Sequence, residues 1–280
     1  MNVEERAVVF ACGDQRLVSI VAIPENSLDR GVLIVVGGPQ YRVGSHRQFL
    51  LLSRQLADAG VPVLRFDYRG MGDSSGNGQT FELVEDDIRA AVDAFFREAP
   101  QIKSVVIWGL CDAASAALMY APLDSRVVGL VLANPWVRTP DGLAKTMMKH
   151  YYGTRLLQWE FWRKLVTGEV NVLSALGGVL RNIFARCARK KENLDATPPF
   201  PERMALGLKR FSGHVVFFLS GQDLTAQEFL EMIQRSPRWQ DALKRPHIEW
   251  RRLDDATHTF SRREWRDRVG HWTIEWIRSW

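Results

Sequence analysis

Many of the sequence signatures that identify a function at once are missing from this chain. It has no CxxC pair, no HExxH or HxxxH helix motif and no GxxxxGK[ST] phosphate-binding loop. Its three cysteines, Cys12, Cys111 and Cys187, are an odd number at wide spacing, so they provide no disulfide framework. These absences argue against a structural zinc and against a P-loop nucleotide site, and we expect neither a metal nor a cofactor.

Long hydrophobic runs are also missing. No apolar stretch approaches the roughly 20 residues that span a bilayer. The N-terminal sequence carries acidic residues in place of the basic start and apolar core of a signal peptide, so we expect a cytoplasmic protein. With 46% hydrophobic and 25% charged residues, the composition is that of a globular chain, and 280 residues suit one large α/β domain with an insertion.

Short β-branched runs alternate with helical patterns along most of the chain, as in a parallel sheet with crossover helices. The first two runs are separated only by a Gly13-Asp14 turn, which predicts an antiparallel hairpin. The whole pattern predicts a mostly parallel, doubly wound α/β sheet of eight strands. We expect strands at 7–10, 17–23, 31–36, 62–66, 104–108, 127–133, 214–220 and 247–253, and helices at 46–59, 81–99, 112–121, 225–234 and 262–278.

Residues 138–210 depart from that alternation. The segment is helical in pattern, contains no convincing strand and closes with Thr197-Pro-Pro-Phe-Pro201, which suits neither a helix nor a strand. It carries 14 Lys and Arg against 6 Asp and Glu, a net charge of +8, whereas the rest of the chain carries −3. We therefore predict a core formed by residues 1–137 and 211–280, and a helical cap, 138–210, inserted after the sixth strand.

The predicted cap contains aromatic side chains interleaved with basic ones. Tyr151, Trp159 and Trp162 are candidates for substrate contacts, and an amphipathic stretch after them ends in the basic run 186–191. One interpretation is a cap helix whose apolar face covers the active site while its basic end is solvated. The other is a surface that meets an anionic membrane or an acidic polysaccharide. No nucleic-acid-binding motif accompanies the charge, so we expect no nucleic-acid partner.

Five short motifs follow one another along the chain: Val36-Gly-Gly-Pro-Gln40, Asp67-Tyr-Arg-Gly-Met-Gly-Asp-Ser74, Gly109-Leu-Cys-Asp-Ala113, Gly221-Gln-Asp223 and Thr257-His258. In content and order they resemble the motifs of the α/β-hydrolase superfamily over essentially the whole chain, which implies the α/β-hydrolase fold. More narrowly, the stretches GLCDAASA and GQDLTAQEF resemble the type 1 hydrolases associated with exosortase A systems. That bacterial family is linked to exopolysaccharide production and protein sorting, so the resemblance implies a genomic setting but no particular substrate.

The cysteine in the third motif is the candidate nucleophile. In the superfamily motif G-x-S-x-G the nucleophile sits on a strained turn between a strand and a helix, and its small neighbours prevent clashes. Gly109 and Ala113 are those neighbours here, and Cys111 replaces the serine. The chain is similar in this respect to dienelactone hydrolases and polyester synthases, which carry cysteine at the turn. The alternative is a buried structural thiol.

A catalytic thiol requires a base, and the base requires an acid that orients it. His258 follows the last strand, where a loop can return it over Cys111. Asp223 ends the seventh strand, and the chain order nucleophile, acid, base matches that of these hydrolases. Asp254 and Asp255 are rival acids, but their closeness to the histidine in sequence suits them better to shaping its loop. The remaining histidines open strands or lie in helices or in the cap, and fit less well: His46, His150, His214, His247 and His271.

An oxyanion hole completes such a site with two N–H donors. We expect the backbone N–H of Asp112 to be one of them, because it opens a helix directly after the nucleophile. The other is expected in the loop after the third strand, where Pro39 has no N–H. The resemblance to the HGGPG motif of iminopeptidase-like members points to Gly38, with Gln40 as second choice. Val36 stands in place of the histidine of that motif.

Two further acidic stretches need their own interpretation. The Asp112 carboxylate either pairs with the helix dipole or, as a like charge, disfavours the Cys111 thiolate until substrate binds. The glycines of motif 67–74 indicate a tight turn, and we expect Arg69 to pair with a nearby carboxylate.

Two functions of different classes follow. The first is a hydrolase or acyltransferase that attacks an ester or thioester through Cys111, His258 and Asp223, with a small-molecule, lipid or glycan acyl substrate. The second is a non-catalytic binding partner with the same fold in an envelope or polysaccharide pathway. The loss of serine at the turn and the carboxylate of Asp112 beside the thiol both favour the second.

Overall fold

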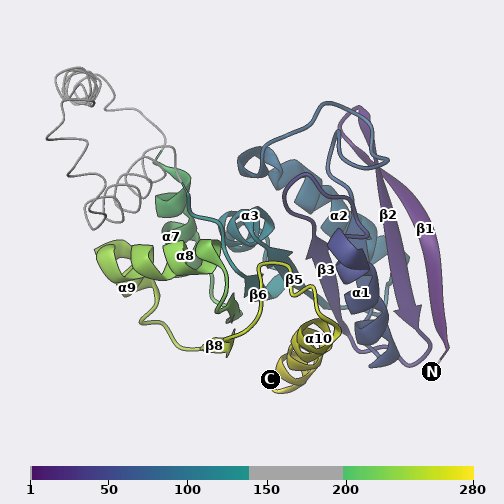
Figure 1. The fold of residues 1–280 in the computed structure, drawn as a ribbon. Coiled ribbons are helices and arrows are strands. Elements are labelled where there is room, and N and C mark those ends of the chain that lie inside the picture. Colours follow the sequence, from purple (N-terminus) through teal and green to yellow (C-terminus); the bar gives the residue numbers. More distant parts are fainter. Residues whose placement is uncertain (1, 139–197) are drawn as a thin grey trace, which may run out of the picture. The chain divides into compact units, whose positions relative to one another are not determined.

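The computed structural model describes residues 2–138 and 198–280. Eight strands form one sheet in the order β1-β2-β4-β3-β5-β6-β7-β8 (Figure 1). β1 pairs antiparallel with β2, and β2 antiparallel with β4, whereas all other neighbours are parallel. The strands are β1 (Val3–Cys12), β2 (Gln15–Pro24), β3 (Arg30–Val35), β4 (Val63–Phe66), β5 (Ser104–Leu110), β6 (Val127–Ala133), β7 (His214–Ser220) and β8 (Ile248–Leu253).

Helices cover both faces of this sheet, as the predicted doubly wound architecture requires. They are α1 (Gln48–Asp58), α2 (Glu85–Glu98), α3 (Asp112–Tyr120), α7 (Phe200–Arg210), α8 (Leu224–Arg235), α9 (Pro237–Ala242) and α10 (Arg263–Arg278), with 3-10 turns η1 (Ser45–Arg47), η2 (Phe81–Leu83) and η3 (Ala121–Leu123). The predicted mostly parallel eight-stranded sheet and its first hairpin are confirmed. The hairpin strands are longer than predicted, because the polar, largely exposed start of β1 does not resemble a buried strand.

Alternation along the central strands explains why the helices form two layers. In β3, Leu33 and Val35 belong to the apolar cluster that contains α2, α3, α7, α8 and α9. Val32 and Ile34, which point to the opposite face, belong to the cluster that contains α1 and α10. A parallel strand with both faces buried reads as a continuous apolar run, and this is why the sequence identified these strands well.

The chain divides into two compact units, one formed by Met1–Val137 with Pro199–Trp280 and the other by Arg138–Pro198. The expected insertion and the second unit begin at the same residue but end differently, at 210 and at 198. Residues 200–210 form α7 in the larger unit, because the prolines around Phe200 start that helix instead of ending another. Tyr151, Trp159, Trp162, Cys187 and the basic run 186–191 lie outside the described residues. In the described part of the chain, no helix combines the length and apolar character needed to cross a membrane.

The contact of α7 with α3 gives a test of this arrangement. A Cβ added at Gly207 would lie 2.0 Å from the carbonyl oxygen of Leu118, and this backbone atom has no room to yield. We expect Gly207→Ala to lower the free energy of unfolding by about 1–3 kcal/mol, measured by urea denaturation. Gly78→Ala is the control, because a Cβ at Gly78 would meet nothing within 4 Å. Equal unfolding midpoints for the two variants would contradict the packing of α7 on α3.

Candidate active site

Cys111 lies on a sharp turn between β5 and α3, as predicted. Its backbone angles are φ 63° and ψ −125°, a conformation that residues other than glycine adopt only under strain. A Cβ at Gly109 would lie 2.7 Å from the backbone of Ala113, so the position before the turn requires glycine. The backbone N–H of Cys111 donates to the carbonyl oxygen of Ala133 at 2.9 Å, which ties the turn to the end of β6. The side chain of Cys111 is half-buried.

Asp223 and His258 form a hydrogen-bonded pair at the carboxyl ends of β7 and β8. The Nδ1 of His258 lies 2.8 Å from Oδ2 of Asp223. The Asp223 carboxylate also caps α8, where it accepts backbone N–H groups of Thr225 at 3.1 Å and Ala226 at 3.3 Å. With Nδ1–H donating to a fixed carboxylate, the other ring nitrogen is left as the proton acceptor. The imidazole side chain is 33% exposed and the Asp223 side chain is buried.

The rival acids occupy other positions. Asp254 is exposed and its Oδ1 lies 2.7 Å from Nε of Arg252, and Asp255 is exposed as well. Of the three carboxylates considered, Asp223 is the one that contacts the His258 ring.

A buried amide holds the loop that carries His258. Asn134 is fully buried directly after β6, and its Nδ2 donates to the carbonyl oxygen of His258 and to Oγ of Ser220, both at 2.9 Å. Its Oδ1 accepts the N–H of Ser220 at 2.8 Å, and the Ser220 hydroxyl donates to the carbonyl oxygen of Thr257 at 3.0 Å. We call Asn134 and Ser220 the loop clamp. Neither was identified from the sequence, although a lone polar residue between an apolar strand and Pro135 is the signal that could have found Asn134.

The loop clamp and the turn at Cys111 meet at one place in the sheet. Ala133 accepts the N–H of Cys111, and the next residue, Asn134, binds the carbonyl oxygen of His258. The backbones of Cys111 and His258 are therefore fixed to two consecutive residues. The structure thus brings the predicted nucleophile and the predicted base to one end of the sheet.

The carboxylate of Asp112 points toward the loop after β3. Its Oδ1 accepts the backbone N–H of Gly38 at 2.7 Å. Burial raises the pKa of Asp112, while hydrogen bonds from the backbone N–H groups of Gly38, Ala113 and Asp112 itself oppose that rise. Gly37 leaves the space for this carboxylate, because a Cβ there would lie 2.2 Å from its Oδ1.

This arrangement changes how the predicted oxyanion donors must be viewed. We expected the N–H groups of Gly38 and Asp112 to be open to a substrate, whereas the N–H of Gly38 donates to the Asp112 carboxylate. The second choice, Gln40, donates its N–H to the carbonyl oxygen of Gly38 at 2.8 Å, and its side chain accepts the N–H of Ser45 at 2.9 Å. The pairing of Gly38 with Asp112 as donors stays a prediction.

Motif 67–74 is structural, as its glycines indicated. The predicted pairing of Arg69 is confirmed, because its guanidinium binds Oδ2 of the buried Asp87 at 2.7 and 2.9 Å. Asp67 is buried, pairs with Arg42 and accepts the N–H of Asp73 at 3.1 Å. These ion pairs hold the loop after β4.

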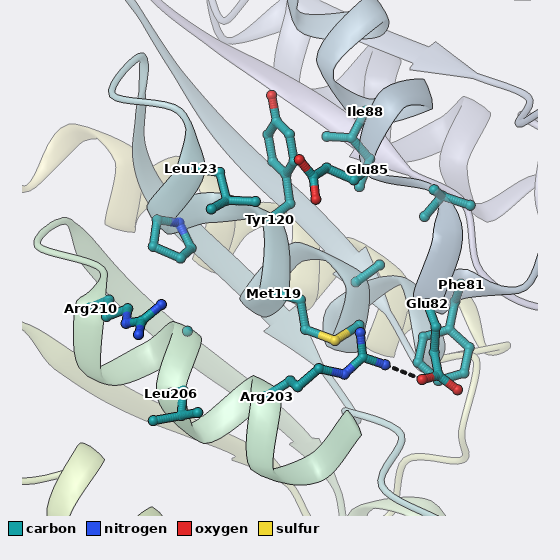
Figure 2. Close-up of a pocket in the computed structure, with 14 residues that line it drawn as sticks. Phe81, Glu82, Glu85, Ile88, Met119, Tyr120, Leu123, Arg203, Leu206 and Arg210 are labelled. Atoms are coloured by element: carbon teal, nitrogen blue, oxygen red, sulfur yellow. Dashed lines mark hydrogen bonds and ion pairs between the residues drawn. The ribbon is translucent and has the colours of Figure 1, made fainter. Parts of the chain in front are cut away.

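A separate pocket of about 230 Å³ lies between α3, α7 and η2. Figure 2 shows its charged rim, where Arg203 of α7 reaches Glu82 of η2, and its apolar wall with Met119 and Phe81. None of the predicted site residues lines it. Within residues 2–138 and 198–280, no three His, Cys, Asp or Glu side chains are grouped to hold a metal ion.

Comparisons with known proteins agree with the fold. A model of the alpha/beta hydrolase family matches residues 32–272. Human protein ABHD12B is 33% identical over 124 residues, which cover 40% of this chain and 33% of that protein, so the chain matches about a third of this relative's length. An esterase from Pyrococcus furiosus superposes with a TM-score of 0.67 at 17% identity, covering 99% of this chain and 91% of its own.

Two further solved structures have the same fold. A dienelactone hydrolase from Anabaena variabilis has a TM-score of 0.62 at 15% identity, covering 99% of this chain and 98% of its own. A proline iminopeptidase from Mycobacterium smegmatis has a TM-score of 0.59 at 14% identity, covering 97% and 98%. The match of the family model over most of the chain, together with the turn at Cys111 and the Asp223–His258 pair, leads to one conclusion: the chain belongs to the alpha/beta hydrolase family.

Proposed function

We propose that the protein is a hydrolase or acyltransferase that acts on an ester or thioester through Cys111, His258 and Asp223. One observation carries the proposal. His258, which lies 2.8 Å from Asp223, is in a loop that is hydrogen-bonded to the end of β6, and the turn at Cys111 is hydrogen-bonded to the same strand end. A hydrogen-bonded acid–base pair beside a thiol on a strained turn is the arrangement that nucleophilic acyl transfer needs.

The geometry supports the following sequence of steps. Nε2 of His258 takes the proton of Cys111, and the sulfur attacks the carbonyl carbon of the substrate. The tetrahedral intermediate collapses, the bond to the leaving oxygen or sulfur breaks, and His258 returns the proton to it. His258 then takes a proton from water or from an acceptor hydroxyl, whose oxygen attacks the carbonyl carbon of the thioester. The bond between this carbon and sulfur breaks, the acyl group leaves as an acid or a new ester, and His258 returns the proton to the sulfur of Cys111. Asp223 holds the imidazole in the required tautomer throughout.

The wider setting is also a proposal. The stretches GLCDAASA and GQDLTAQEF support a place in bacterial exosortase- and exopolysaccharide-linked metabolism, in the cytoplasm, with a small-molecule, lipid or glycan acyl substrate. Contact of the basic run 186–191 with an anionic membrane or an acidic polysaccharide is part of the same proposal.

One observation favours the alternative, a non-catalytic binding protein. The Asp112 carboxylate binds the N–H of Gly38, one of the two groups that an acyl-transfer enzyme would offer to its oxyanion. A site filled in this way does no chemistry unless the carboxylate leaves, and this is why the reactivity of Cys111 is the first property to measure.

The nucleophile can be tested by its reactivity. We expect an activated aryl ester to acylate Cys111, and we expect Cys111→Ala to remove the adduct and lower ester turnover by about 10³-fold or more. Intact-protein and peptide mass spectrometry would locate the acyl group. Iodoacetamide should alkylate Cys111 faster than the buried Cys12, because burial and the charge of Asp87 raise the pKa of the Cys12 thiol. An acyl group on another residue, or equal slow alkylation of both thiols, would contradict the proposal.

The loop clamp gives a second test. Asn134 has a positive φ of 42°, so Asn134→Gly removes the amide without straining the backbone. We expect alkylation of Cys111 below neutral pH to slow by about tenfold, because an imidazole that is no longer held in place stabilises the thiolate less well. Stability should fall by about 1–3 kcal/mol, since Ser220 loses buried partners. The control is Asn26→Gly at an exposed position, and an unchanged pH profile in Asn134→Gly would show that the clamp does not position His258.

A further inference from the structure

Three backbone N–H groups converge beside Cys111. Two of them, from Asp112 and Ala113, open α3, and the third, from Gly38, comes from the loop after β3. N–H groups at a helix N-terminus favour an anion, and in acyl transfer such a cluster receives the negative oxygen of the tetrahedral intermediate. The cluster in this chain already contacts an anion, the carboxylate of Asp112.

The contacts of that carboxylate are those an oxyanion would make. Its Oδ1 accepts the Gly38 N–H at 2.7 Å, and the N–H groups of Asp112 and Ala113 also stabilise its charge. The loop has room for it because Gly37 lacks a side chain: a Cβ there would lie 2.2 Å from Oδ1 and 2.5 Å from the carbonyl oxygen of Leu110. The carboxylate therefore fits a space that the loop leaves open for it.

A second observation concerns a buried hydroxyl without a partner, which would receive the displaced carboxylate. The hydroxyl of Tyr68 is buried and has no hydrogen-bond partner among the described residues. Burial raises the pKa of Tyr68 well above its usual range, and the charge of Asp112 adds to that rise, so the two groups lie within electrostatic reach. Tyr68 follows β4 and Asp112 follows β5, and both strands pair in parallel with β3, so the two residues lie at the same edge of the sheet. A buried hydroxyl without a hydrogen-bond partner lowers stability, and a carboxylate that accepts a hydrogen bond from it would remove this cost.

We propose that Asp112 determines substrate specificity for the acyl transfer proposed above: its carboxylate fills the oxyanion site at rest, so that substrates able to displace it toward Tyr68 acylate Cys111 fastest. The inference rests on that proposed function. Displacement breaks the charge-assisted hydrogen bond from Gly38 and moves the carboxylate away from the start of α3, and the Tyr68 hydroxyl offers one hydrogen bond in return. A substrate with contacts away from its carbonyl group can supply the difference, whereas a small activated ester lacks such contacts and acylates Cys111 slowly. The residue thus selects against small esters.

Acylation of Cys111 by p-nitrophenyl acetate, measured in the full chain, tests this. Asp112→Ala empties the oxyanion site, and we expect acylation to become faster by about tenfold or more. Asp112→Asn removes the charge but keeps an oxygen that can accept the Gly38 N–H, so we expect a much smaller change. Asp112→Ser, whose side chain is too short to reach Gly38, replaces the alanine variant if that variant does not fold. Asp58→Ala is the matched control at an exposed carboxylate.

Asp112 could slow acylation because its carboxylate fills the oxyanion site or because its charge disfavours the Cys111 thiolate. Alkylation by iodoacetamide separates these two effects, because it needs the thiolate but no oxyanion site. We expect Asp112→Ala to increase the rate of acylation far more than the rate of alkylation.

Tyr68→Phe should slow acylation by about threefold or more in the wild-type background but leave it unchanged in Asp112→Ala, as a double-mutant cycle would show. Equal gains for the alanine and asparagine variants, or parallel gains in acylation and alkylation, would overturn the specificity role while leaving the proposed function intact. No acylation of Cys111 in any variant would overturn the proposed function and this inference with it.

Discussion

Two consecutive residues at the end of β6 hold the two halves of the site in register. The carbonyl oxygen of Ala133 accepts the N–H of Cys111, and the amide of Asn134 binds the carbonyl oxygen of His258. Because β6 is a central strand with neighbours on both sides, its end is among the least movable points of the sheet. The strained turn at Cys111 and the loop after β8 are both tied to this rigid strand end, which fixes the backbones of Cys111 and His258 relative to each other.

Asp223 joins the same frame through a different element. Its carboxylate accepts two backbone N–H groups at the start of α8, and Oδ2, which accepts the N–H of Ala226, also binds Nδ1 of His258. The donors that cap the helix also fix the orientation of the carboxylate. The side chain of Asp223 therefore does two things: it caps α8 and it orients the ring of His258. The exposed Asp254 has no comparable support, because its partner is an arginine at the surface.

The sequence predicts most of this arrangement, and the reasons differ from residue to residue. The parallel strands were identifiable because both faces are buried, and the turn at Cys111 because Gly109 and Ala113 flank it in sequence. The role of Asn134 was not identifiable, because its partners Ser220 and His258 are 86 and 124 positions away and no local pattern encodes them. The inward orientation of Asp112 depends on Gly38, 74 positions away. α7 was missed for another reason: prolines that start a helix resemble prolines that end one.

The way in which His258 is held has a consequence for turnover. The loop clamp binds its backbone, whereas the ring itself is attached to the protein at Nδ1 by the bond to Asp223. The main chain is thus fixed at one carbonyl oxygen, while the ring can still turn about its bond to Cβ within the reach of the Asp223 hydrogen bond. In the proposed acyl transfer, a small rotation of the ring would carry a proton from the sulfur to the leaving group. That transfer would need no opening or closing of the segment after β8.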